Sequence, residues 1–228
     1  ANTTGVRNTA FGNTALNQNV SGTDNAAFGH EALYFNTASN NAAFGCQALH
    51  DTTGSNNTAV GFKAGYFTTT GGSSVAVGAF ALQFNTTGPN NIAIGYEALN
   101  GNTTAADNTA VGYQALKANT AAYNTAVGVR AMYLNTSGTQ NAAFGQDVMG
   151  SNTTGSYNAA FGAAGALNAN TTGSNNTAVG NNALRVNTTA SDNTAVGYES
   201  AYSNTTGTLN TSVGGNSLRT NTTGGNNV

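Results

Sequence analysis

The chain has 228 residues, of which only 6% are charged, 30 are glycine and none is tryptophan. Globular domains carry charge on about a quarter of their residues, so an ordinary globular surface is excluded. The formal net charge of −2, with no run of Lys or Arg, excludes the basic footprint of a nucleic-acid-binding protein. We therefore expect no nucleic acid partner.

Membrane and disulfide signals are missing from the sequence. No stretch approaches the roughly 20 apolar residues of a membrane span, so we expect none in this segment. Cys46 is the single cysteine, which rules out an internal disulfide. Both ends of the sequence lie inside the repeat described next, so we expect the chain to be a segment of a longer fibre.

An N-x-A-[VFI]-G motif recurs along the whole chain at intervals of 16 to 18 residues. Its glycines are Gly12, Gly29, Gly45, Gly61, Gly78, Gly95, Gly112, Gly128, Gly145, Gly162, Gly180, Gly197 and Gly214. Self-similarity at a fixed period indicates a stacked repeat architecture. We predict a single continuous array over residues 1–228, with about thirteen coils of 17 residues.

The first element of each repeat is a short strand that ends at the motif glycine. A large apolar residue precedes the glycine in every copy. The residue two positions before this large residue is β-branched in nine copies, as in 92–94 (Ile-Ala-Ile). This alternation predicts a β-strand. We expect the large residue to close the interior of the coil. Asparagine recurs four residues before the glycine in all copies except Ser74, which predicts a ladder of side-chain amides.

The second element follows the glycine and carries an alanine and then a leucine or methionine, as in 98–99 and 131–132. We predict a second short strand here. The third element, Asn-Thr-Thr-Gly-Ser-Asn in its commonest form, is a turn, because Gly and Asn tolerate the positive backbone angles of tight corners. One such coil is too small to be stable alone, so neighbouring coils must stack and exchange backbone hydrogen bonds. The predicted fold is an all-β parallel solenoid with two short strands per coil.

Alanine occupies the position two before the glycine in every copy but one, where Ser212 replaces it. A residue that faced water would have no reason to stay small. We therefore predict that this column, with its Thr, Val and Ile neighbours, is a subunit interface between identical chains. The alternative is that the alanines fill a narrow coil interior. The candidate interface residues are Ala10, Ala27, Ala43, Ala59, Ala76, Ala93, Ala110, Ala126, Ala143, Ala160, Ala178 and Ala195.

The Asn-Thr-Ala-Val-Gly strand, with its variants at 74–78 and 91–95, resembles the head repeat of YadA-like trimeric autotransporter adhesins. Similar arrays occur in phage tail-fibre proteins. The resemblance covers essentially the whole chain, and it implies a left-handed parallel β-roll with three chains to a shaft, displayed outside a cell or on a virion. The adhesin head repeat is commonly shorter than this one, and the sequence contains no coiled-coil stalk, membrane anchor or terminal chaperone.

Catalytic and metal-binding constellations are lacking in the sequence. His30 and His50 have no matching Cys or carboxylate cluster at metal-ligand spacing, and no nucleophile motif or phosphate loop occurs. We predict a non-enzymatic protein with no metal or other cofactor. Sequons are explained by the repeated turn chemistry, with glycosylation left open; examples are Asn2, Asn85, Asn102, Asn152, Asn170, Asn187, Asn204 and Asn221.

Variation is concentrated immediately after the glycine and four residues later, where tyrosine is frequent. Tyrosine combines an apolar ring with a polar tip, which suits carbohydrate or protein surfaces. The alternative is that the rings form a structural ladder. The candidate partner-binding ridge consists of Tyr34, Tyr66, Tyr96, Tyr113, Tyr133, Tyr198 and Tyr202.

These features predict an extracellular structural and adhesive fibre shaft on a cell surface or virion. We expect a homo-oligomer, specifically a trimer, whose partner is a carbohydrate or a cell-surface receptor. One alternative is a filament subunit that stacks end to end. Another is an ice-binding solenoid, because threonine recurs in the turn from Thr37 and Thr53 to Thr222.

Overall fold

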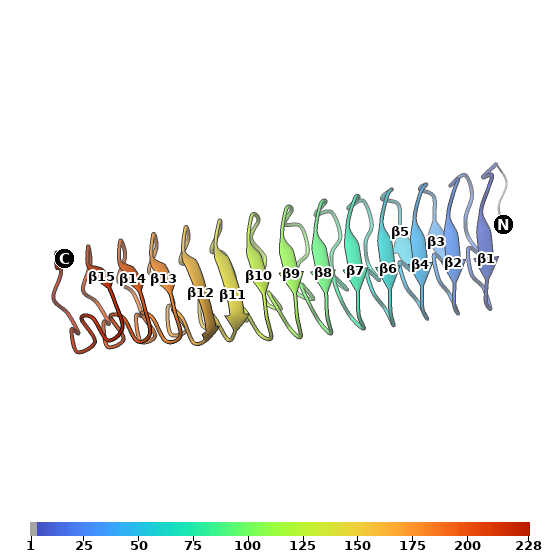
Figure 1. The fold of residues 1–228 in the computed structure, drawn as a ribbon. Coiled ribbons are helices and arrows are strands. Elements are labelled where there is room, and N and C mark those ends of the chain that lie inside the picture. Colours follow the sequence, from blue (N-terminus) through green and yellow to red (C-terminus); the bar gives the residue numbers. More distant parts are fainter. Residues whose placement is uncertain (1–3) are drawn as a thin grey trace. The chain divides into compact units, whose positions relative to one another are not determined.

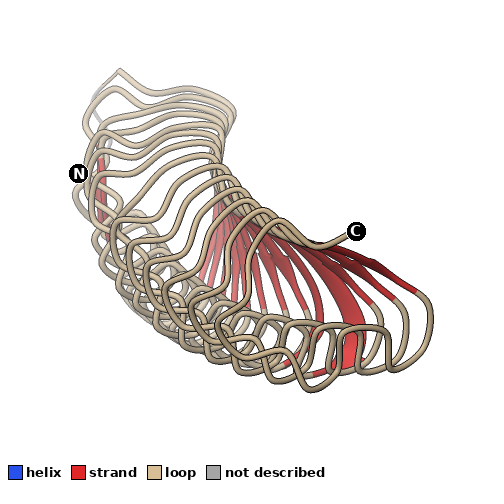
Figure 2. Ribbon diagram, turned by 90° about the vertical axis from the view of Figure 1, so that its left-hand side faces the viewer, coloured by secondary structure: helices blue, strands red, loops and turns tan. Residues whose placement is uncertain are grey.

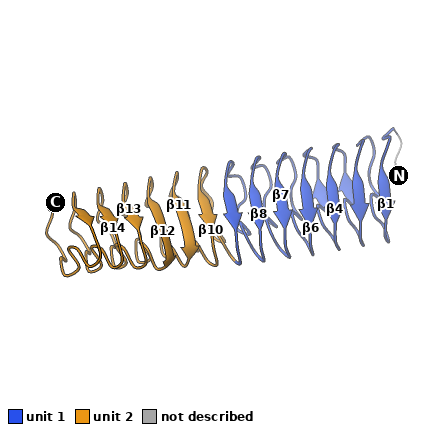
Figure 3. Cartoon of the chain, viewed as in Figure 1, with its two compact units in different colours: residues 1–113 blue, residues 114–228 orange. Residues whose placement is uncertain are grey.

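A computed structural model describes residues 4–228, which fold without any helix into stacked parallel coils (Figure 1). The chain forms two compact units, residues 1–113 and 114–228 (Figure 3). Each unit repeats one design, a short strand followed by a long turn-rich segment that returns to the next strand. The prediction of an all-β parallel solenoid with turns of about 17 residues is confirmed. That the array is continuous over residues 1–228 stays a prediction.

The first unit contains a parallel sheet whose strands follow one another in chain order, each separated from the next by one coil. Its strands are β1 (Thr9–Phe11), β2 (Ala26–Phe28), β4 (Ala42–Phe44), β6 (Thr58–Val60), β7 (Val75–Val77), β8 (Ile92–Ile94) and β9 (Thr109–Val111). Two further strands, β3 (Phe35–Asn36) and β5 (Asp51–Thr52), pair with each other on another side of the coils. Equivalent residues of successive strands lie directly opposite one another, as Ala93 and Ala110 do.

The second unit has the same design, with strands β10 (Thr125–Val127), β11 (Ala142–Gln146), β12 (Ala159–Ala164), β13 (Thr177–Val179), β14 (Thr194–Val196) and β15 (Thr211–Val213). Its strands again pair in parallel, in chain order. The pairing of β11 with β12 changes register between Phe144 and Gln146, because the coil that follows is one residue longer. In the second unit the strands gather on one side of the coils, and in the first unit all strands except β3 and β5 do so; loops form the rest (Figure 2).

The prediction of a second strand in every coil is wrong for most of the chain. The residues after the motif glycine form turns, and only β3 and β5 are strands outside the main sheet of the described residues. The backbone there alternates in handedness, with positive φ at Glu97 and Leu99 and their equivalents. Inter-coil hydrogen bonds are still made, such as Leu82 N to Ala98 O at 2.9 Å. A hydrophobic pattern alone could not distinguish this compact bend from a strand.

Leucine and alanine fill the interior. The leucine column is buried from Leu16 to Leu184, with Met132 and Met149 taking two of its positions. The alanines after the glycine are buried with it, as Ala98 and Ala115 are. The large residue before the glycine points outward instead, so the prediction that it closes the coil is wrong.

The alanines proposed as a subunit interface also lie inside the coil. The buried members are Ala27, Ala43, Ala59, Ala76, Ala93, Ala110, Ala126, Ala143, Ala160, Ala178 and Ala195. Ala10, in the first strand, is exposed. Because these eleven side chains face the interior of their own coil, the interface prediction is wrong for them. The alternative, that alanine fills a narrow interior, is confirmed.

Candidate interaction surfaces

The outward side of the main strands is an apolar surface, which we call the strand face. It is built from the first and third residues of each three-residue strand, because side chains alternate between the two sides of a sheet. The third residue is Val, Ile or Phe, and the first is Thr, Ala, Val or Ile. Ile92 and Ile94 are 40% and 39% exposed, respectively, although the alanine between them is fully buried. No Asp, Glu, Lys or Arg occupies either position in any of the main strands.

Aromatic rings on the strand face stack from coil to coil. The Phe28 and Phe44 rings are 4.9 Å apart and nearly parallel, and in the second unit Phe144 and Phe161 are 4.8 Å apart. The ring separations match the distance between hydrogen-bonded strands. Each unit thus presents regular apolar rows to its surroundings.

The tyrosines predicted to form one ridge lie in two separate columns. Tyr96, Tyr113 and Tyr198 directly follow the motif glycine and are exposed, and the rings of Tyr96 and Tyr113 stack at 5.5 Å. The others lie four residues further on and are half-buried. This second column, which we call the ridge column, contains Tyr34, Tyr66, Tyr133 and Tyr202.

The ridge column of the first unit is a stack of rings. His50 lies between Tyr34 and Tyr66, with ring centroids 5.1 and 4.7 Å away and planes within 9° of parallel. A His50 ring nitrogen lies 2.6 Å from an Asp51 carboxylate oxygen. Burial raises the pKa of Tyr66, and the nearby Asp51 and Glu31 carboxylates raise it further. These residues form a structural ladder as well as a surface.

A second ring and ion-pair cluster lies near the end of the second unit. The Arg219 Nε atom donates to a Glu199 carboxylate oxygen at 2.6 Å, and this hydrogen bond lowers the pKa of Glu199. Tyr198 hydrogen-bonds to the same carboxylate, which raises the pKa of Tyr198. Arg219 also lies over the Tyr202 ring. Both tyrosine columns are therefore held by charged neighbours at this point. Their role as a partner-binding ridge stays a prediction.

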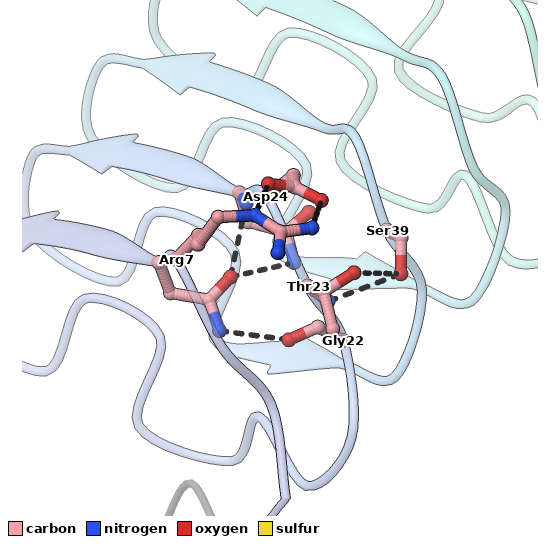
Figure 4. A network of polar contacts seen from close by, with 7 residues as sticks. Arg7, Gly22, Thr23, Asp24 and Ser39 are labelled. Carbon is pink, nitrogen blue, oxygen red and sulfur yellow. Dashed lines mark hydrogen bonds and ion pairs between the residues drawn. The ribbon is translucent and has the colours of Figure 1, made fainter.

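Asparagine builds two buried ladders along the corners. In the ladder that precedes the strands, a side-chain oxygen accepts the backbone N–H of the equivalent residue one coil on, as Asn41 Oδ1 does from Asn57 N at 2.8 Å. Figure 4 shows the polar network in the first coils, where Thr23 N donates to Ser39 Oγ and the Arg7 guanidinium pairs with Asp24. The predicted amide ladder is present, but its main bonds run from side chain to backbone.

The second ladder contains the asparagines of the sequons. Asn152 Nδ2 donates to Asn135 Oδ1 at 2.8 Å and to the Gly155 carbonyl at 2.9 Å. Asn85, Asn102, Asn152, Asn170, Asn187 and Asn204 are all fully buried, which makes their side chains inaccessible to a glycosylating enzyme in the folded chain. Asn221 is partly exposed, and Asn2 lies outside the described residues. The structure thus favours turn chemistry as the reason for these sequons.

Threonines in the turn use their hydroxyl protons within the protein. Thr136 Oγ1 donates to the Thr153 carbonyl at 3.0 Å, and Thr153 Oγ1 donates to the Thr171 carbonyl at 2.9 Å. The same bond recurs in most coils from Thr53 onward. This threonine column is therefore part of the inter-coil bonding.

One hollow of about 590 Å³ lies in the second unit, beside the ridge column. Arg130, Tyr133, Asp147 and Arg185 are among the residues that line it. The prediction of the ridge named Tyr133 but not the hollow. The signal in the sequence is a glycine, Gly150, at a ridge position that elsewhere carries a side chain.

Within residues 4–228 no three His, Cys, Asp or Glu residues are grouped as a metal site would require. No helix of the described chain has the length and apolarity needed to cross a membrane. Cys46 is exposed and unpaired by a disulfide, with its sulfur 3.9 Å from a His30 ring nitrogen.

Comparison of the chain with known protein families, characterised proteins and solved structures finds no match.

Proposed function

We propose that the chain is a non-enzymatic structural segment of an extracellular fibre, displayed on a cell surface or virion. In this proposal identical chains associate through their strand faces, and the tyrosine columns contact glycans or surface proteins. The observation that carries the proposal is the strand face, which is apolar and free of charge through every strand of both units. Contiguous apolar patches of this kind on soluble proteins mark interaction sites.

A second copy of the same chain is the occupant that best fits this surface. Its rows of Val, Ile, Phe and Thr repeat at the coil spacing, so an identical face presents the same rows at the same spacing. Two such faces can interdigitate as the sheets of a β-sandwich do, about 10 Å apart. A charged partner would bury its charges against residues that offer no counter-charge, which is costly.

The resemblance to YadA-like heads and phage fibres supports a finer form of the proposal. It implies three chains about a common axis and left-handed coils. In a closed symmetric trimer each strand face would be buried against the other two chains. No strand face would then remain exposed to bind further chains without limit. We propose this trimer as the assembled state.

Mass in solution tests the association. We expect multi-angle light scattering after gel filtration to give about three times the 22.7 kDa of the chain. The double variant Val60→Lys and Ile94→Lys places charges on β6 and β8, two exposed positions separated by a full coil. Burying two lysines without partners is unfavourable, so we expect this variant to run at the mass of one chain.

The matched control is Thr70→Lys with Thr104→Lys, which adds the same charge at exposed turn positions outside the strand face. It should keep the wild-type mass. A well-folded wild-type monomer, or strand-face and turn variants of equal mass, would overturn the proposal. Electron micrographs that show long filaments in dilute solution would instead favour the filament alternative, in which chains stack end to end.

Ice binding is the second candidate, and the structure moves it to another surface. The turn threonines donate their hydroxyl protons to backbone carbonyls, whereas Thr58, Thr109, Thr125, Thr177 and Thr194 lie on the outward side of the strands. A monomer that shows thermal hysteresis, which Thr109→Lys and Thr125→Lys abolish, would support this candidate. We prefer the fibre, because alanine, valine or isoleucine interrupts the threonine row in six strands of the main sheet.

A further inference from the structure

The ridge column has a missing side chain in the second unit. Inter-coil bonds fix its order there: Ala118 N bonds Tyr133 O, Leu134 N bonds Gly150 O, and Ser151 N bonds Asn168 O. Lys117, Tyr133, Gly150, Asn168 and Arg185 therefore follow one another at successive coils. In the first unit the equivalent Tyr34, His50 and Tyr66 rings stack face to face. At Gly150 no ring stacks on Tyr133, and the Arg130 guanidinium lies over the Tyr133 ring, 5.6 Å from its centroid.

The gap left by Gly150 has the thickness of one ring. Successive coils are about 4.8 Å apart, so Tyr133 and Asn168 are separated by about 9.6 Å along the column. Stacked rings in the same column of the first unit lie 4.7 and 5.1 Å apart. The Asn168 side chain reaches back toward this gap, and its Nδ2 lies 3.1 Å from the position that a Cβ atom on Gly150 would take. The 590 Å³ hollow that opens here is in the range of small-ligand sites.

An irregular coil keeps the far side of the hollow open. One extra residue lies within β12 between Phe161 and Ala164, β12 runs on to Ala164, and Gly165 has a positive φ of 68°. A Cβ atom at Gly165 would lie 2.8 Å from the Asn182 side-chain oxygen. A side chain is thus disfavoured at this wall by the backbone conformation, whereas the Asn182 side chain can shift to make space.

The polar groups of the hollow suit an acidic, hydroxyl-rich ligand. Asp147 accepts from Arg130 at 3.2 Å, and Asn168 Nδ2 donates to the Asp147 carbonyl at 2.6 Å. Arg185 donates to the Tyr202 hydroxyl at 3.2 Å and interacts electrostatically with Glu199, which also pairs with Arg219. Two arginines and one carboxylate line the hollow itself, so its lining carries a net positive charge. Arginine is well suited to bind a carboxylate through two parallel hydrogen bonds.

We propose that this hollow binds a pyranose sugar that carries a carboxylate, as a uronic acid does. The sugar ring occupies the hollow above Gly150, its carboxylate pairs with Arg185, and its hydroxyls bond Asp147 and Asn168. A flat aromatic acid would pair with Arg185 but make fewer hydrogen bonds to Asp147 and Asn168, which weakens binding. The inference rests on the adhesive part of the proposed function and is independent of association through the strand face.

Isothermal titration with methyl β-D-glucuronide and methyl β-D-glucoside tests the site, because the two ligands differ only in the carboxylate. We expect saturable binding of the glucuronide and at least tenfold weaker binding of the glucoside. Gly150→Tyr should weaken glucuronide binding at least tenfold by supplying the missing ring. Its Cβ is tolerated, since the nearest atom is the flexible Asn168 side-chain nitrogen at 3.1 Å. The control Asn100→Tyr also places a tyrosine in the ridge column, but in the first unit, and should bind normally.

Arg185→Gln provides a second variant at an exposed side chain. It should lower the glucuronide affinity to that of the glucoside, whereas Arg7→Gln, which removes an equally exposed arginine from the first unit, should not. The proposal is overturned if the glucuronide does not saturate, if the glucoside or benzoate binds as well, or if Gly150→Tyr binds as wild type does. Mass in solution is measured on the same samples. A trimer that ignores the glucuronide refutes the site alone, and a monomer that binds it refutes the strand-face assembly alone.

Discussion

At the scale of single residues, the motif glycine is fixed by two independent constraints. Gly95 has a φ of +134°, a region closed to side chains, and a Cβ there would lie 2.3 Å from the Gly112 carbonyl oxygen. The same approach recurs from coil to coil. Gly214, in the last coil, has a φ of +116° but nothing within 4 Å of its Cβ position. Comparing Gly95 with Gly214 therefore distinguishes the effect of backbone strain from that of steric overlap.

We expect Gly95→Ala to lower the free energy of unfolding by more than about 3 kcal/mol, because strain of about 1–3 kcal/mol is joined by overlap with a backbone oxygen. Gly214→Ala carries the strain alone and should cost clearly less. Urea denaturation followed by circular dichroism measures both. Equal losses for the two variants would mean that close stacking of coils does not constrain this position.

Buried asparagine is the second constraint at this scale. Asn152 donates two hydrogen bonds and accepts one from Asn170 at 2.7 Å, all away from water. Asn152→Ala should therefore cost about 1–3 kcal/mol, the penalty for leaving buried polar groups without partners. Thr154→Ala, at an exposed position two residues on, should change the unfolding midpoint little. If both variants have the same midpoint, the amide ladder does not stabilise the coils.

At the scale of elements, each three-residue strand divides its residues between interior and surface. Its central alanine is small because it meets the other side of its own narrow coil. Ser200 and Ser212 show this directly: both replace interior alanines, and their hydroxyls hydrogen-bond each other at 2.7 Å. The space between strand and turn is filled by the leucine column. Apolar residues before the glycine are left for contacts outside the coil.

Truncation of the two apolar columns should have unequal effects on an isolated chain. Leu99 is fully buried, so Leu99→Ala should cost about 2–5 kcal/mol, as for other core leucines. Ile94 is exposed on the strand face, so Ile94→Ala should change the unfolding free energy of the monomer by less than about 1 kcal/mol. Chemical denaturation in the Val60→Lys background, where association is weakened, makes the comparison. A larger loss for Ile94→Ala would place that residue in the core.

At the scale of the whole molecule, charge contributes little to stability. Only fourteen residues are Lys, Arg, Asp or Glu, and the cohesion of each unit comes from backbone bonds, amide ladders and leucine packing. Three carboxylates have lowered pKa values: Asp24 through Arg7, Glu31 through Gln47 and Glu199 through Arg219. These pairs lie at the surface, where ion pairs are screened by water and contribute little.

We expect the urea midpoint to stay nearly constant from about pH 8 to pH 5. A carboxylate with a lowered folded pKa contributes stability above its ordinary pKa of about 4, and this contribution is lost as the pH falls through the lowered value. Any decline should therefore begin below about pH 4 and be small. Glu199→Gln should make this decline in the urea midpoint smaller still. A steep loss between pH 7 and 5 would contradict this picture.

The sequence by itself determined the period, the all-β solenoid, the corner chemistry and the presence of an amide ladder. Each of these follows from a local requirement repeated thirteen times, such as the positive φ at glycine or the pairing of equivalent asparagines. Alternation along the strand does not tell which side of the sheet faces the coil interior, because a small residue fits a narrow interior as well as a tight interface between chains. The apolar pattern of the leucine segment predicts a strand, because the alternating backbone handedness that the segment adopts leaves no separate mark in the sequence.

Only the tertiary structure decided which column is buried, since that depends on how far apart the two sides of a coil lie. It placed the alanines inside and the Val, Ile and Phe column outside, which moves the candidate assembly surface by one residue along the strand. It also showed the gap at Gly150, where the chemistry of a site comes from residues on several coils. A missing side chain has meaning only once its neighbours in space are known.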